Sequence, residues 1–191
     1  MDVWDQIDLL LHRYEHNERH RAMLKRLVSR LPPDIASVTE SKRARAQAIG
    51  AEALYHLGEV ERLLAWAVPP LTPAAALWVA YTLFDLSRFS EALPYQRWVL
   101  KESDLQDWAR CKLNECVLCC RIHVEPATVT LDDISVLHTE YQSLGIDAPV
   151  PVELHRALAY AEESGALPGT LIAEARELFM DTFREWSLDK K

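Results

Sequence analysis

Residues 111–123 combine four cysteines and a histidine in a segment that has the pattern of one helix. Cys116, Cys120 and His123 are spaced by four and three residues, which places them on one helix face. Thiolate and imidazole are the usual ligands of zinc, but structural zinc sites combine ligand pairs from two segments, and no second Cys-x-x-Cys follows. The neighbouring side chains of Cys119 and Cys120 point apart, which disfavours a redox pair. We expect buried thiols without metal, and keep a metal or redox sensor as an alternative.

A second group of candidate ligands is a row of histidines near the start of the chain. His12, His16 and His20 recur every four residues and share a face if the helix is unbroken. His12 and His16 with Glu15 could hold a weakly bound transition metal. Arg13, Arg19 and Arg21 flank the row, so a solvated basic face is the favoured interpretation.

Charge is distributed unevenly along the chain. Residues 12–45 carry nine bases and four acids, whereas 125–191 carry five bases and thirteen acids, within a net charge of −8. The region 19–45, with Arg26 and Arg30 on one face, is an alternative regulatory surface for nucleic acid or an acidic partner. The net charge and the lack of stacking aromatics disfavour nucleic acid. Pairing with the acidic third of another copy would instead give a homo-oligomer.

Motifs for catalysis are missing from the sequence. It contains no G-x-G-x-x-G, Walker loop, G-x-S-x-G or H-E-x-x-H. Only five of the 191 residues are glycine, so there is little material for phosphate loops. We therefore expect a protein that is not an enzyme and that holds no cofactor.

The elements that must position these side chains all have helical periodicity. Apolar residues recur at helical spacing, and no alternating strand pattern competes with them. Short links predict antiparallel pairs in a single all-α domain, 1–191, with 124–130 as its weakest link. The expected helices, about ten, lie at 3–14, 23–31, 40–57, 59–68, 72–86, 90–102, 104–123, 130–145, 152–164 and 170–187.

Two of the expected helices carry a repeated pattern. In 51–60 and 80–89 a small residue is followed by leucine three residues later, a turn residue at seven and an apolar residue at nine. The stretch 86–100 resembles the turn and second helix of a tetratricopeptide repeat (TPR). The resemblance is clearest over 45–102, where the period is shorter than the family's 34 or so residues. It implies stacked helix pairs in a right-handed superhelix; an irregular helical bundle is the competing architecture.

The resemblance also implies a binding groove lined by the first helix of each pair. Its aromatic and charged positions would suit an extended or helical peptide, although large residues at helical spacing are also typical of a core. The positions that the resemblance assigns to the groove are Arg45, Ala48, Glu52, Tyr55, His56, Ala74, Leu77, Tyr81, Phe84 and Asp85.

The leading functional hypothesis is a protein–protein interaction module, an adaptor or chaperone that binds a peptide or protein partner. The start of the chain has no signal-peptide pattern and no apolar run is long enough to span a membrane, so a cytoplasmic location without membrane contact is expected. The sequence does not identify the partner. Gly50 falls inside a helix where the repeat has a larger residue, and we expect a neighbouring helix or a bound peptide to approach closely there.

Overall fold

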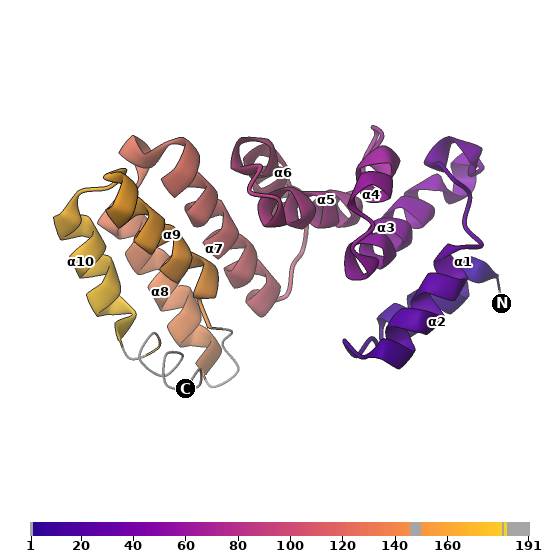
Figure 1. Cartoon of the computed structure of the whole chain (residues 1–191), viewed down its shortest axis with the longest axis horizontal. Helices are drawn as coiled ribbons and strands as arrows, with labels where there is room; N and C mark the ends of the chain where they lie inside the picture. The colour runs from indigo at the N-terminus through magenta and orange to yellow at the C-terminus, as the bar shows by residue number, and fades with distance from the viewer. Residues whose placement is uncertain (1, 146–149, 181, 183–191) are drawn as a thin grey trace. The chain divides into compact units, whose positions relative to one another are not determined.

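A computed structural model describes residues 2–145, 150–180 and 182. The described residues form α-helices and two 3-10 turns, η1 (Ile35–Ser37) and η2 (Pro126–Thr128), without a strand (Figure 1). The all-α prediction is confirmed, and the expected extension of the last helix to residue 187 lies outside the described residues. The helices are α1 (Val3–Leu11), α2 (Glu18–Val28), α3 (Glu40–Leu57), α4 (Val60–Trp66), α5 (Pro73–Asp85), α6 (Phe89–Glu102), α7 (Asp107–Val124), α8 (Leu131–Leu144), α9 (Val152–Ser164) and α10 (Gly169–Leu178).

The chain divides into two compact units. Unit 1 is Met1–Leu86 and unit 2 is Ser87–Lys191, so the division falls between α5 and α6. The segment 124–130, which the sequence predicted as the weakest link, lies inside unit 2. That both units belong to one domain stays a prediction.

Unit 1 is built around α3, which packs against α1, α2, α4 and α5. The alanines of α3 let these neighbours approach closely, and Ala46 and Ala53 are fully buried. At Gly50 the neighbour is so close that a Cβ atom built on the glycine would lie 2.8 Å from Cε3 of Trp66. The close approach expected at Gly50 is therefore confirmed, and the neighbour is a side chain of α4. Trp66 is 1% exposed and donates its indole N–H to the Pro33 carbonyl at 3.2 Å.

Unit 2 is built around α7, which packs against α6, α8 and α9, while α10 closes over α8 and α9 (Figure 1). The inward face of α7 carries leucine, isoleucine and cysteine. The start of α8 has the capping box that the sequence predicted: the Thr130 hydroxyl accepts from the Asp133 N–H, and the Asp133 carboxylate accepts from the Thr130 N–H.

The fold shows helix pairs but does not test the TPR resemblance. The first repeat-like pair, α3 and α4, packs together inside unit 1. The second, α5 and α6, spans the division between the units, so a repeating superhelix stays a prediction. None of the described helices is long and apolar enough to cross a membrane.

Candidate functional site

A cluster of aromatic side chains lies where α3 and α5 pack together in unit 1. Trp78 is at its centre, with ring centroids 5.0 Å from Tyr55, 5.3 Å from His56 and 6.0 Å from Tyr81. Tyr14, from the link after α1, stacks on His56 at 4.8 Å. All five side chains are half-buried, so they pack on one another and still reach solvent. We call these five residues the aromatic cluster.

Acidic groups border the aromatic cluster. The Tyr55 hydroxyl donates to the exposed Asp85 carboxylate at 3.1 Å. Glu52, one turn before His56, lies 4.0 Å from its Nε2, and burial raises the pKa of this carboxyl. Burial also lowers the pKa of His56, and the nearby His16 adds to that effect. A neutral imidazole is thus favoured inside an otherwise acidic border.

The structure brings together some of the residues that the resemblance assigned to a groove. Tyr55, His56, Tyr81 and Asp85 meet at the aromatic cluster, as described above. Arg45 does not join them, because its guanidinium donates to Asp5 at 2.9 Å and to Asp8 at 3.5 Å on α1. Phe84 is buried at 8% exposure, and Leu77 is half-buried.

Sequence reasoning missed two members of the aromatic cluster, Trp78 and Tyr14, but it included Tyr81. Trp78 and Tyr81 are three residues apart on α5, so the spacing alone would have placed both on one face. Tyr14 carried no such signal, because it lies in an irregular link and reaches His56 only through the tertiary fold.

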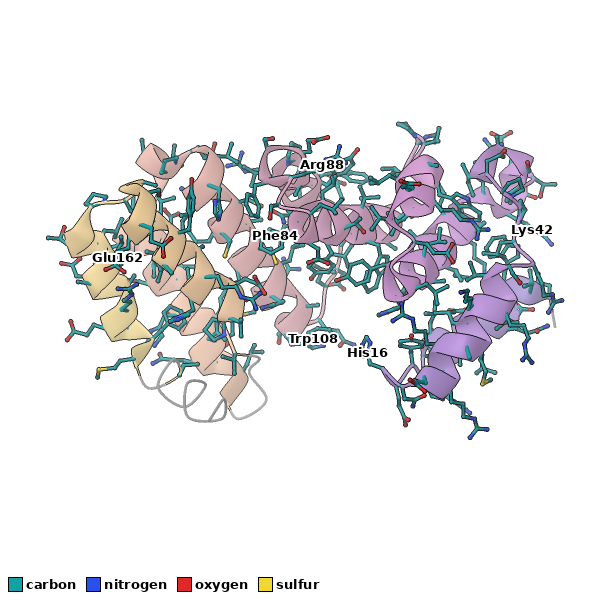
Figure 2. All side chains as sticks on the ribbon, in the orientation of Figure 1. His16, Lys42, Phe84, Arg88, Trp108 and Glu162 are labelled. Carbon is teal, nitrogen blue, oxygen red and sulfur yellow. The ribbon has the colours of Figure 1, made fainter. Side chains whose placement is uncertain are left out.

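The three histidines would share a helix face only in an unbroken helix, and the structure does not meet that condition. α1 ends at Leu11 and α2 begins at Glu18. Asn17 is the N-cap of α2, and its side chain accepts a hydrogen bond from the His20 N–H. His16 lies in the intervening link (Figure 2). Asn17 is a strong N-cap residue, which explains the break.

Many bases of the region 19–45 are used inside unit 1. Lys42 lies 3.9 Å from Asp2, and Arg21 donates to the Leu57 carbonyl at 3.1 Å. Arg43 donates to the Val38 carbonyl at 3.5 Å. These contacts hold α1, α2 and η1 to α3 and reduce the charge left for a nucleic-acid backbone.

The cysteine-rich helix is part of the core of unit 2. Burial raises the pKa of Cys111 and of Cys120 to about 12, and it raises the pKa of Cys116 and of Cys119 as well. These groups therefore stay as thiols at neutral pH, whereas nucleophilic attack requires the thiolate. Among the described residues no group of three or more His, Cys, Asp or Glu could hold a metal ion.

His123, the imidazole candidate for that metal site, makes aromatic contacts instead. Its ring stacks on Phe89 at 4.1 Å and lies 4.1 Å from the ring of Tyr160. Burial lowers the pKa of His123. The ring therefore packs as a flat, neutral side chain in unit 2.

A buried carboxylate ties three helices of unit 2 together. Glu115 on α7 is fully buried and accepts from Lys112 Nζ at 2.5 Å, the Tyr141 hydroxyl at 2.7 Å and the Leu154 N–H at 2.9 Å. Burial works to lower the pKa of Lys112, but Glu115 outweighs it and the pKa is raised. With all its partners inside the protein, Glu115 is a structural group.

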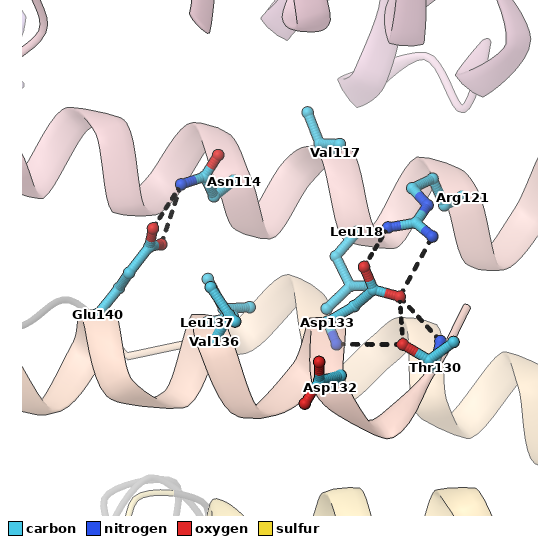
Figure 3. A pocket seen from close by; sticks show the side chains of 10 residues that line it. All are labelled: Asn114, Val117, Leu118, Arg121, Thr130, Asp132, Asp133, Val136, Leu137 and Glu140. Atoms are coloured by element: carbon cyan, nitrogen blue, oxygen red, sulfur yellow. Dashed lines mark hydrogen bonds and ion pairs between the residues drawn. The ribbon is translucent and has the colours of Figure 1, made fainter. Parts of the chain in front are cut away.

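A pocket of about 310 Å³ lies between α7 and α8 (Figure 3). At one end Arg121 pairs with Asp133 at 2.7 Å, and at the other Asn114 donates to Glu140 at 2.8 Å. The floor between them is apolar, and Leu137 is one of its members. At each end of the pocket, these two polar side chains thus bind one another.

Comparisons of the chain with protein-family models, with curated proteins and with solved structures find no match. The resemblance to TPR proteins therefore stays a prediction from the sequence, and any function rests on the geometry above.

Proposed function

We propose that this chain is a non-enzymatic protein-interaction module and that the aromatic cluster of unit 1 binds a peptide or protein partner. The observation that carries this proposal is the half-exposed state of Trp78, Tyr55 and Tyr81. An aromatic ring used only for packing can be buried completely, as Trp66 is in the same unit. Tryptophan and tyrosine dominate binding hot spots because they offer large rigid surfaces at low entropic cost.

The border of the cluster indicates the chemistry of the partner. Asp85 is exposed beside Tyr55, and the faces of Tyr55 and Trp78 are the kind that attract lysine and arginine side chains. A peptide with a basic residue flanked by apolar ones would satisfy both the rings and the carboxylate.

The state of the other candidate residues agrees with a binding role. The cysteines are buried thiols, and the Glu115 carboxylate is occupied by structural partners. Neither group is available as a nucleophile or a general base without unfolding part of unit 2.

A pull-down with chemical cross-linking tests the proposal. Tagged wild-type chain is compared with Tyr55→Ala/Tyr81→Ala, and circular dichroism verifies that both are folded. We expect the double variant to lose the wild-type partners. Trp108→Ala, which removes an exposed aromatic of unit 2, serves as the matched control and should retain them. If the folded double variant retains every partner, the cluster is ordinary packing and the proposal fails.

Asp85→Asn tests the charge of the partner. Removing the negative charge of this carboxylate should lower the affinity for a basic partner about two- to fivefold, which is the size of a modest surface electrostatic contribution. An unchanged affinity would mean that the rings alone carry the contact.

A further inference from the structure

A second surface of unit 1 has the opposite chemistry to the aromatic cluster. A groove of about 440 Å³ lies between α1 and α2, with a floor of apolar side chains. Leu9 is 48% exposed and Met23 is 45% exposed, although both point into this groove with Leu10 and Leu27. Large apolar side chains left open in one place mark interaction surfaces.

The rim of the groove is basic. Arg13, His20 and Arg26 line it, and none of its lining residues is acidic. Arg13 and Arg26 form no ion pair with any residue that the structure describes. Their charges therefore remain available to a ligand.

The acids of α1 are turned away from the groove. Asp5 and Asp8 face α3, where both accept from Arg45. Their pairing there leaves Leu9, Leu10 and Arg13 on the side that faces α2. The carboxylates of α1 thus lie toward α3, whereas the guanidinium of Arg13, two residues after α1, lies at the groove.

We propose that the α1–α2 groove binds an acidic amphipathic helix of a partner protein. Two packed helices present ridges and a furrow into which a third helix fits, and helix-in-groove binding places apolar residues at i, i+3, i+4 and i+7 on the floor. Glutamate or aspartate on the flanks would then meet Arg13 and Arg26, whose planar guanidinium groups suit carboxylates. This site is separate from the aromatic cluster, and its proposal does not depend on the function proposed above.

A separate protein fits this groove better than a second copy of the chain. The acidic helices of unit 2 already use several carboxylates internally: Glu162 pairs with Arg176 at 2.7 Å, and Glu153 with Arg156 at 3.0 Å. A partner helix with free carboxylates would not have to break such pairs.

The test uses fluorescence anisotropy with the full chain and defined helical peptides. The probes have an apolar stripe of leucine, methionine or phenylalanine at i, i+3, i+4 and i+7, with glutamate on both flanks. One control set carries lysine in place of glutamate, and another has the same composition with the stripe scrambled. We expect at least one acidic probe to bind with a Kd of roughly micromolar order, and both control sets to bind at least about tenfold more weakly.

Two variants and a matched control locate the binding. The affinity for the acidic probe should fall at least about tenfold in each of two variants, Arg13→Glu/Arg26→Glu and Met23→Asp. Arg19→Glu/Lys25→Glu makes the same charge change on exposed bases of α2 outside the groove, and should change the affinity less than about twofold.

Four results would overturn the proposal. They are no binding by any acidic probe, equal binding by lysine or scrambled probes, an equal loss in the Arg19→Glu/Lys25→Glu control, and a dimer in light scattering that Met23→Asp converts to monomer. The last would assign the groove to a second copy.

Discussion

The two units differ in where some of their polar and aromatic side chains lie. In unit 2, Glu115 is completely buried with three donors around it, and Arg121 and Asp133 satisfy each other beside the α7–α8 pocket. In unit 1, the rings around Trp78 remain half-exposed, and Arg13 and Arg26 line an open groove. Unit 1 also joins its helices through polar contacts such as that of Arg45 with Asp5, but it has in addition aromatic and basic side chains that reach the surface.

The largest expected effect comes from breaking the buried network of unit 2. Glu115→Ala removes the shared acceptor of Lys112, Tyr141 and the Leu154 N–H, and leaves the lysine ammonium half-buried without its carboxylate. Breaking a buried pair in this way costs about 3 kcal/mol of unfolding free energy. Urea denaturation followed by circular dichroism measures the loss.

Glu163→Gln, at an exposed position of α9, is the control and should change stability by less than about 0.5 kcal/mol. If Glu115→Ala is equally silent, unit 2 is not held by this network and the contrast between the units disappears.

The next effect falls on the core of unit 1. Gly50→Ala places a methyl group against the ring of Trp66, and overpacking costs about 1–3 kcal/mol. Alanine's better helix propensity returns about 1 kcal/mol, so we expect a net loss of up to about 2 kcal/mol by thermal or urea unfolding.

Gly169→Ala is the matched control, because no atom lies within 4 Å of the Cβ atom that it adds. It should be neutral or stabilising. Trp66→Phe should reduce the cost of Gly50→Ala in a double-mutant cycle, and additivity of the two changes would contradict the proposed contact.

A smaller effect, of opposite sign, is expected inside unit 2. Gln96 is fully buried, and its amide has no hydrogen-bond partner among the described residues apart from its approach to the Cys120 thiol. Gln96→Leu should therefore stabilise the chain by about 1 kcal/mol, because an unsatisfied buried amide is costly. Gln142→Leu, at an exposed site, provides the baseline; a destabilised Gln96→Leu variant would show that the amide is paired.

The smallest effect is the pH dependence of unit 1. The pKa of His56 is lowered by burial and by His16, so the unfolded chain binds this proton more tightly than the folded chain does. Stability is therefore highest above the unfolded pKa of about 6.5 and decreases as the pH falls from there through the folded pKa. His56→Gln should flatten the dependence of the urea midpoint between pH 7 and 5, and an unchanged slope would exclude His56 as its source.

The helices could be predicted from sequence because their signals are local. Thr130 and Asp133 cap α8 within one turn, and Gly58 ends α3 in a left-handed conformation with a φ of 72°. Gly50 was also found locally, as a glycine inside a helix where a larger residue was expected.

The site could be predicted only in part, because its contacts are tertiary. Arg45 matched a groove position, but its partners Asp5 and Asp8 lie 40 and 37 residues earlier in the chain. No local sequence pattern pairs Arg45 with residues so far away. Likewise, nothing in the sequence around Glu115 distinguishes it from a surface glutamate of α7. Only the docking of α8 and α9 reveals its donors.

The bond from Glu115 to the Leu154 N–H has a consequence for how unit 2 assembles. The residue before α9 is Pro151, and no local side chain caps this helix. Its cap instead comes from α7, 39 residues earlier. α9 therefore gains a complete N-terminus only after α7 has docked. The amide proton of Leu154 should exchange with solvent only when the two helices separate. Its exchange rate therefore reports how often α9 separates from α7.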